Sequence, residues 1–235
     1  MSAVVDYTHD YDPDVDFDSW YTDHTAAALV EHLRPGDRVL ELGCATGRMT
    51  ARMVAAGADV LGVDRSADYI ERAAARGLPS ARFTVGDVEA HVRHERRRYH
   101  HVVATNLLHE LEDPGGFVAA AAGCLHPQGH LHLSLQNPRS LHRLVALEMG
   151  LLDDLGATSA RGAAYGTRRS FTRDELVALG TAAGLAPALA TGVCLKPLPN
   201  DLMATLPPAV LAGMARAARH APDLAAINYV VLTRG

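Results

Sequence analysis

Two glycines and one acidic residue form the first group whose types and spacing could do chemistry. The stretch DRVLELGCATGRM places Glu41 inside an apolar run and follows it with Gly43 and Gly47. A dinucleotide-binding loop needs the spacing G-x-G-x-x-G, because its second and third glycines admit the pyrophosphate and allow close helix packing. Ala45 and Arg48 occupy those two positions, which disfavours a dinucleotide. The loop instead predicts a backbone that approaches a nucleoside carrying no phosphate.

Two further acids follow the next two apolar segments. Asp64 ends the stretch ADVLGVD, and a carboxylate at such a strand tip can accept hydrogen bonds from both hydroxyls of a ribose. Asp87 follows Gly86 after the third apolar segment, where the base of the nucleoside would lie. The three acids therefore predict one nucleoside site built from three strand ends.

The elements that must position these residues alternate between strand-like and helix-like patterns. Helices are expected after the glycine loop, after Ser66 and from Asp113-Pro114, where a capping residue or a first-turn proline marks the start. Short strands joined by crossover helices predict an α/β fold with a mainly parallel sheet covered on both faces. The expected strands span residues 38–43, 58–64, 81–86, 99–106 and 129–136.

Composition narrows the possible partners. A chain of 235 residues with 48% hydrophobic and 21% charged residues is long enough for one sizeable core. A net charge of −5 argues against a nucleic-acid partner, which usually leaves a basic footprint. Without a long apolar run or a basic leader, we expect a cytoplasmic protein that binds no membrane. We expect a monomer or homodimer that acts on a small molecule.

The sequence predicts no metal or disulfide site. Cys44, Cys124 and Cys194 are odd in number and form no CxxC pair. His130 and His132 share one face of a strand, but no third ligand follows at a suitable spacing.

Two segments interrupt the alternation of strands and helices. Residues 1–29 form an arm that combines many Asp residues with aromatic residues, which a purely solvated tail rarely needs. We expect this arm to fold over the bound ligand. The insertion at 138–170 has apolar residues at helical spacing in its first half and is rich in Gly and Ala in its second half. It is predicted to be a helical lid on the domain that spans residues 30–235.

Taken in order, Glu41-x-Gly43-x-x-x-Gly47, Asp64, Gly86-Asp87 and NLLHELEDP resemble the class I S-adenosylmethionine-dependent methyltransferases. The resemblance covers residues 30–137 and continues more loosely into a pattern similar to a bacterial subgroup of small-molecule methyltransferases. It implies a doubly wound, Rossmann-like sheet of seven strands, mostly parallel, with AINYVVLTRG as an antiparallel last strand. It also implies S-adenosylmethionine as the cofactor.

The same resemblance implies a set of contacts with the cofactor. Gly43 and Gly47 would lie along its methionine part, Asp64 would hold the ribose, and Asp87 would face the adenine amino group. Asn106 and Leu107 would line the methyl side. The aromatic rings of Tyr11 and Tyr21 could close over the sulfonium, because a ring face attracts positive charge. The remaining residues expected around the cofactor are Glu41, Cys44, Ala45, Arg65, Gly86 and Val88.

Methyl transfer from a sulfonium needs an acceptor lone pair held in line, with water excluded. A hydroxyl or ammonium acceptor must also lose a proton to a base. His109 is the candidate base, because it lies just past the fourth strand, where the strand order reverses and ligands bind. Alternatively, His109 only packs against or hydrogen-bonds its loop. His142 and Tyr165 in the insertion are further catalytic candidates, followed by Glu110 and Arg168.

The sequence thus predicts methyl transfer to a small-molecule acceptor, on oxygen or nitrogen in preference to carbon, with specialised metabolism as one possible setting. Two alternatives would show the same binding motifs: a noncatalytic S-adenosylmethionine-binding protein, and an enzyme that uses the cofactor without transferring methyl. A nucleic-acid methyltransferase is disfavoured. It would carry an Asn/Asp-Pro-Pro-aromatic turn where this chain has Asn106-Leu107-Leu108-His109.

Overall fold

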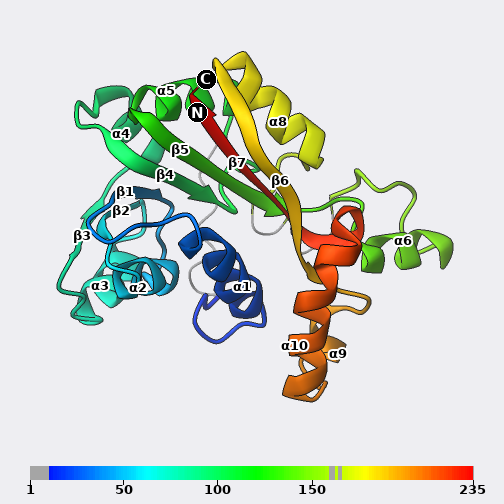
Figure 1. Ribbon diagram of the computed structural model, residues 1–235. Coiled ribbons are helices and arrows are strands. Elements are labelled where there is room, and N and C mark those ends of the chain that lie inside the picture. Colours follow the sequence, from blue (N-terminus) through cyan, green and yellow to red (C-terminus); the bar gives the residue numbers. More distant parts are fainter. Residues whose placement is uncertain (1–10, 159–161, 164–165, 235) are drawn as a thin grey trace.

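A sheet of seven strands forms the centre of the computed structural model, which describes residues 11–158, 162–163 and 166–234 (Figure 1). The strand order is β3-β2-β1-β4-β5-β7-β6. Neighbours among the first five strands pair in parallel, whereas β7 runs antiparallel to both β5 and β6. This confirms the predicted mostly parallel sheet and its antiparallel last strand. The strands are β1 (Arg38–Leu42), β2 (Asp59–Asp64), β3 (Ala81–Val85), β4 (Tyr99–Thr105), β5 (Leu125–Gln136), β6 (Leu185–Leu195) and β7 (Ala225–Arg234).

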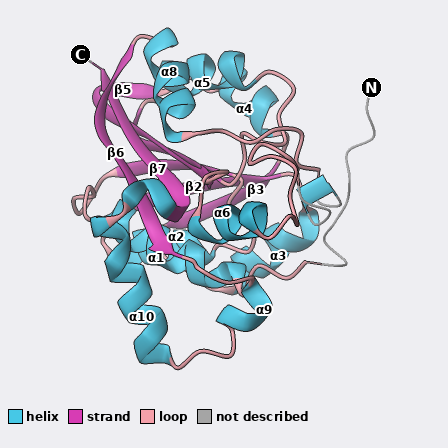
Figure 2. Cartoon of the chain, turned by 90° about the vertical axis from the view of Figure 1, so that its right-hand side faces the viewer, coloured by secondary structure: helices cyan, strands magenta, loops and turns pink. Residues whose placement is uncertain are grey.

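Helices cover both faces of the sheet (Figures 1 and 2). One face carries α1 (Asp18–Val30), α2 (Arg48–Ala55) and α3 (Ala67–Ala75), and the other carries α4 (Val88–His94), α5 (Pro114–Gly123) and α8 (Arg173–Ala182). Beyond the sheet lie α6 (Leu141–Glu148), α9 (Asn200–Met203), α10 (Pro208–Ala217) and two short 3₁₀ turns, Ala218–His220 and Pro222–Leu224. No helix in the described ranges is long and apolar enough to cross a membrane.

The core divides into two clusters because the central strands are apolar on both sides. Leu40 and Leu42 of β1 belong to the cluster under α4, α5 and α8, whereas Val39 packs on the side of α1 and α2. All three side chains are fully buried. Such continuous burial is expected for parallel strands with helices on each face, and it fixes the strand ends that build the site.

The helix starts predicted from capping residues are confirmed. The hydroxyl of Ser66 accepts a hydrogen bond from the backbone N–H of Tyr69 at the start of α3. Asp113 accepts one from the N–H of Gly116 at the start of α5, with Pro114 in its first turn.

The fifth strand was placed too late in the sequence. β5 begins at Leu125 and not at residue 129, and its pairing with β4 shifts register along the way. Gly129 lies at this irregularity, where a Cβ would come within 2.9 Å of the carbonyl oxygen of Tyr99. Glycine was therefore a sign of close backbone approach inside the strand and not of its beginning.

Candidate active site

A cavity of about 820 Å³ opens at the carboxyl ends of β1 to β4. It is lined by Glu41 from β1, Asp64 from β2 and Thr105 from β4, together with Asp87 just after β3. β1 and β4 are neighbours although they are not consecutive, so the strand order reverses here. Ligands of open α/β sheets bind at this kind of reversal. The four strand ends that the sequence singled out therefore meet in one place.

The glycine loop supplies one wall of this cavity. Gly43 lines it with φ +78°, and a Cβ at this position would lie 3.6 Å from the side chain of Leu107. Gly47 does not line the cavity, although the sequence placed it beside the cofactor. It begins α2 with φ +75°, and a Cβ there would lie 3.2 Å from both Ala73 and the ring of Phe83. Gly47 therefore serves close helix packing.

Asp64 is held in place by two backbone N–H groups. Ala45 donates to Oδ2 at 2.8 Å and Ser66 donates to Oδ1 at 3.0 Å. Ala45 adopts the left-handed conformation, with φ 45°, which is uncommon for a residue other than glycine and often marks a functional loop. Each carboxylate oxygen keeps a further lone pair for a ligand. Asp64 can therefore accept from two neighbouring hydroxyls.

Glu41 is a buried carboxyl group, with only 2% of its surface exposed. Burial raises its pKa to about 8, although the hydroxyl of Thr50 donates a hydrogen bond to Oε2 at 2.5 Å; the charge of Asp64 adds to the rise. Glu41 is thus protonated at neutral pH in the free protein. A cation that enters the cavity would favour its ionised form.

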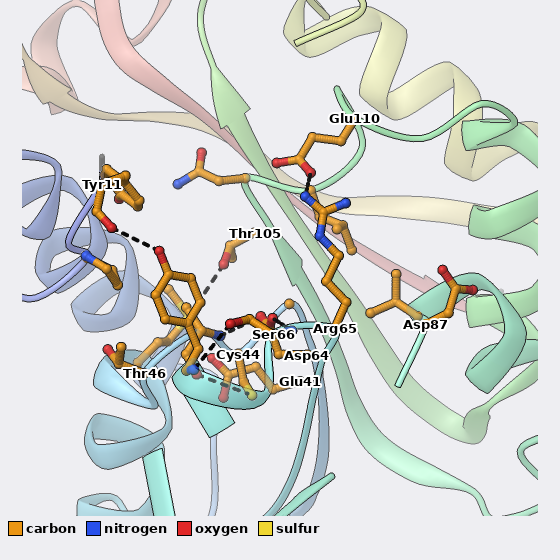
Figure 3. A pocket seen from close by; sticks show the side chains of 18 of the residues that line it. Tyr11, Glu41, Cys44, Thr46, Asp64, Arg65, Ser66, Asp87, Thr105 and Glu110 are labelled. Carbon is orange, nitrogen blue, oxygen red and sulfur yellow. Dashed lines mark hydrogen bonds and ion pairs between the residues drawn. The ribbon is translucent and has the colours of Figure 1, made fainter. Parts of the chain in front are cut away.

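Figure 3 shows an ion pair that spans the cavity between the loops after β2 and β4. A guanidinium nitrogen of Arg65 lies 3.2 Å from Oε2 of Glu110, and both residues line the cavity. Asp87 and Val88 line it on the β3 side, while Gly86 does not. Asp87 also begins α4, where its side chain accepts a hydrogen bond from the N–H of Ala90 at 2.7 Å.

The loop after β4 contributes Asn106 and Leu107, which both line the cavity as expected. Asn106 has φ 49°, a second left-handed residue in the wall of the cavity. Its backbone N–H donates to the carbonyl oxygen of Ser134 at 2.8 Å, which ties the loop to β5.

Only one of the two predicted aromatic residues reaches the cavity. Tyr11 lines it, and the hydroxyl of Tyr69 donates to the carbonyl oxygen of Tyr11 at 2.9 Å. Tyr21 is buried in the core beside Phe17 and Trp20 and does not line the cavity. Its hydroxyl donates to Oδ1 of Asn200 at 2.9 Å. The aromatic residues of α1 therefore pack mainly against one another.

The two catalytic candidates that the structure describes, His109 and His142, do not line the cavity. His109 is not among the lining residues, although its neighbour Glu110 is, and its Nε2 lies 3.7 Å from Oε1 of Glu110. Burial lowers the pKa of His109 to about 4. His142 also lies outside the lining, with Nδ1 3.0 Å from the hydroxyl of Ser140, and burial lowers its pKa to about 3. Tyr165 falls outside the described residues.

The arm and the insertion both reach the cavity. Pro13 from the arm lines it, and ion pairs hold this part of the arm against α2 and α3. These pairs join Asp14 to Arg48, Arg72 and Arg76, Asp12 to Arg72, and Asp23 to Arg48 and Arg52. From the insertion, Arg168 lines the cavity, pairs with Glu112 at 3.3 Å, and donates its backbone N–H to the carbonyl oxygen of His109 at 2.9 Å.

Sequence reasoning missed several lining residues, among them Thr46, Met49 and Tyr69. The hydroxyl of Thr46 is buried and has no hydrogen-bond partner in the described part of the chain. Its place inside the glycine loop was a usable signal, whereas Met49 and Tyr69 look like ordinary apolar positions of α2 and α3.

Comparison with known proteins identifies a family. A model of the family described as "Methyltransferase domain" matches residues 19–189. The chain is 32% identical over 105 residues to a ubiquinone biosynthesis O-methyltransferase of Pectobacterium carotovorum, a match that covers 43% of this chain and 44% of that protein. The chain thus spans less than half the length of this relative.

Two further comparisons extend over more of the chain. A ubiquinone biosynthesis O-methyltransferase of Bordetella avium is 29% identical over 169 residues, which is 69% of this chain and 68% of that protein. Among solved structures, magnesium protoporphyrin IX methyltransferase from Synechocystis with bound S-adenosylhomocysteine has a TM-score of 0.62 at 18% identity. That match covers 93% of this chain and 84% of the other.

Proposed function

This chain belongs to the methyltransferase-domain family and is a class I S-adenosylmethionine-dependent methyltransferase, and we propose that it methylates a small molecule on oxygen or nitrogen. The observation that carries the proposal is the cavity itself. It is lined by Asp64 and Asp87 and also by Glu110 and Arg168. Cavities of this size suit small ligands, and we assign the acceptor to the side of Glu110 and Arg168.

The lining residues fit the cofactor at three points. We assign the ribose hydroxyls to Asp64 and the adenine amino group to Asp87, since both carboxylates border the cavity. The methionine part would lie along Gly43 and Ala45, which both line the cavity. Asn106 and Leu107 would border the methyl group, which the sulfonium makes reactive toward a lone pair.

Proton removal from the acceptor is assigned to a pair of residues. Glu110 borders the cavity and would take the proton from the acceptor oxygen or nitrogen, with His109 3.7 Å behind it. Because burial keeps the His109 pKa at about 4, this imidazole is neutral at physiological pH and can accept a proton or a hydrogen bond. In this proposal Glu110 takes the proton from the acceptor and passes it to His109, which remains the candidate base.

The arm and the insertion at 138–170 are assigned the task of excluding water. Tyr11 and Pro13 border one side of the cavity, and Arg168 borders the other. Excluding water favours displacement at the methyl group, because it leaves only the bound acceptor in reach.

The proposal is tested by an untargeted acceptor screen. Purified protein and S-adenosylmethionine are incubated with fractionated cell extract, and products are followed by mass spectrometry for the gain of one methyl group. Release of S-adenosylhomocysteine should rise with the same fractions, and an Asp64→Asn variant should lower both signals when the cofactor is not saturating. Methylation confined to carbon atoms, or to macromolecules in the extract, would reject the assignment to a small oxygen or nitrogen acceptor.

A further inference from the structure

A second cavity, of about 60 Å³, lies at the opposite ends of the strands from the cofactor cavity. Tyr99, the first residue of β4, and Asp59, the first residue of β2, both line it. Its most unusual feature is its charge. Four arginines take part in its lining: Arg38, Arg82, Arg97 and Arg98.

Strand register brings the first two arginines to one face of the sheet. Leu61 pairs with Leu40 of β1 on one side and with Arg82 of β3 on the other. Arg38 lies two residues before Leu40, and residues two apart on a strand share a face. Arg38 and Arg82 therefore flank Leu61 on the side of the sheet that packs against α4 and α5.

The loop between α4 and β4 supplies the other two arginines. The carboxylate of Glu95 organises this loop: Oε1 accepts from the backbone N–H groups of Arg96 and Arg97 at 2.8 and 2.7 Å, and Oε2 accepts from the hydroxyl of Tyr99 at 2.9 Å. Glu95 thus holds the backbone while Arg97 and Arg98 line the cavity. Nη1 of Arg98 also donates to the carbonyl oxygens of Arg96 and Arg97, at 3.3 and 3.2 Å.

No carboxylate of the described residues lies within ion-pair distance of any of these four guanidinium groups, not even Asp59 in the same lining. The contrast within the molecule is clear, because Arg48, Arg72 and Arg76 near the cofactor cavity each pair with an aspartate. The chain has 27 acidic and 22 basic side chains, so carboxylates are not scarce. All four arginines are exposed, so water screens the repulsion between them and an anion from solution can reach the pocket.

We propose that this arginine pocket binds a phosphate group. Guanidinium groups suit phosphate because their planar N–H donors match its oxygens in pairs. A volume of about 60 Å³ is about twice the ~30 Å³ that one water takes up in the liquid, which fits one phosphate group and little more. Inorganic phosphate and the phosphate of a mononucleotide share this chemistry.

The proposal is independent of methyl transfer. The arginine pocket lies at the amino ends of β1, β2 and β4, whereas the cofactor cavity lies at the carboxyl ends. Variants in the arginine pocket should therefore leave the affinity for S-adenosylhomocysteine unchanged, which also reports that they are folded.

The test is isothermal titration of the full chain, saturated with S-adenosylhomocysteine so that the cofactor cavity is filled, with sodium phosphate, AMP or adenosine at fixed ionic strength. Arg82→Gln and Arg97→Gln should each weaken phosphate binding about tenfold or more, because each removes a charge-assisted contact. Asp59→Asn should strengthen it several-fold, because a carboxylate beside the anion is lost. Arg96→Gln is the matched control: it removes the same charge from the same loop but from a residue outside the lining.

Binding of phosphate alone would identify the free ion, and binding of phosphate and AMP but not adenosine would identify a nucleotide phosphate. Failure of both phosphate and AMP to bind the wild-type protein would overturn the proposal. Equal weakening by Arg82→Gln and Arg96→Gln would overturn it too, because the attraction would then be general and not local. Asp59→Asn keeps the test decisive if an arginine variant does not fold.

Discussion

At the scale of single residues, Glu41 should couple cofactor binding to the release of a proton. Its pKa of about 8 in the free protein should fall when the positively charged cofactor enters, so binding at pH 7 should release a proton. Calorimetric titration in two buffers of different ionisation enthalpy measures this release. The effect should disappear in Glu41→Gln, and equal heats in both buffers for the wild type would contradict it.

The same shift predicts how the free protein responds to pH. Because the folded state raises the Glu41 pKa above its ordinary value of 4.5, its contribution to stability is complete below pH 4.5 and is lost as pH rises through about 8. Glu41→Gln should remove this part of the decline in the free energy of unfolding.

Asp64 should contribute to cofactor affinity by accepting hydrogen bonds. Asp64→Asn removes the charge and replaces one acceptor oxygen with a donor, which should weaken binding by roughly 1.5 to 3 kcal/mol. Calorimetry with S-adenosylhomocysteine measures this loss. Glu71→Gln on α3 is a suitable control, since Glu71 is exposed and lies outside the cavity lining. An unchanged affinity in Asp64→Asn would reject the ribose assignment.

For His109, burial changes the expected pH profile. A histidine base of ordinary pKa would give a rate that rises with pH over the usual imidazole range. With a pKa of about 4, His109 loses its proton at a lower pH than an ordinary imidazole does. The rate should therefore rise through about pH 4 and then stay level. His109→Ala and Glu110→Gln should each lower the rate roughly 10²- to 10⁴-fold with little change in cofactor affinity. An inflection that persists in His109→Ala would place the base elsewhere.

Residue types predicted the acids of the site better than its aromatic residues. The sequence could place Asp64 and Asp87 at one cavity because a polar residue at the end of a buried strand has a fixed position at the sheet edge. Tyr21 was misplaced because the position of a residue on a helix depends on which face packs inward, and α1 turns Tyr21 toward Asn200. Thr46 was missed because the absence of a partner for its hydroxyl is a property of the folded loop.

At the scale of elements, ion pairs attach the part of the arm that precedes α1 to the domain. Asp14 by itself forms ion pairs with three arginines, Arg48, Arg72 and Arg76. It lies close in sequence to Tyr11 and Pro13, the two arm residues that border the cavity. Asp14→Asn should weaken this attachment and speed the dissociation of S-adenosylhomocysteine several-fold, an effect that added salt should reproduce in the wild type. Stopped-flow dissociation measures it.

The control for that experiment is Asp153→Asn, a matched charge change at an exposed residue of the insertion. If both variants release the ligand at the same rate as the wild type, the arm does not restrain the cofactor.

At the scale of the whole molecule, a buried chain of hydrogen bonds joins several strands. His101 of β4 lies 3.1 Å from Asp37 through Nε2 and 2.9 Å from His132 of β5 through Nδ1, and His132 lies 2.7 Å from the hydroxyl of Tyr229 of β7. Burial lowers the pKa of His101 to about 4 and that of His132 well below its usual range. Within the described ranges, no group of three or more His, Cys, Asp or Glu residues could hold a metal ion.

This chain of hydrogen bonds should make the fold sensitive to acid. Both imidazoles stay neutral in the folded state, whereas the unfolded chain binds protons near pH 6.5, so their contribution is complete above pH 6.5 and lost as pH falls to about 4. His132→Leu should lower the free energy of unfolding by about 1 to 3 kcal/mol at pH 7.5, because it leaves buried partners unpaired. Below pH 6.5, the free energy of unfolding should fall less steeply with pH in this variant than in the wild type. Urea unfolding at several pH values measures both effects, and an unchanged slope would contradict the assignment.

The first five strands and their crossover helices were more predictable than β6 and the arginine pocket. Apolar segments that alternate with capped helices identified the first five strands and the crossovers between them, because burial on both faces leaves a continuous signal. β6 gave a weaker pattern, since Ala186, Pro187 and Ala188 on this edge strand are exposed. No local signal in the sequence records that four arginines distant in the chain meet at one end of the sheet.

The position of β7 has a consequence for how the protein is made. β7 lies between β5 and β6, although both precede it in the chain. While the ribosome synthesises the protein, β5 therefore has an open edge and β6 lacks its neighbour until residues 225–234 emerge. Open strand edges invite pairing with other chains. Nascent chains halted before this segment should thus be the forms that most need chaperones.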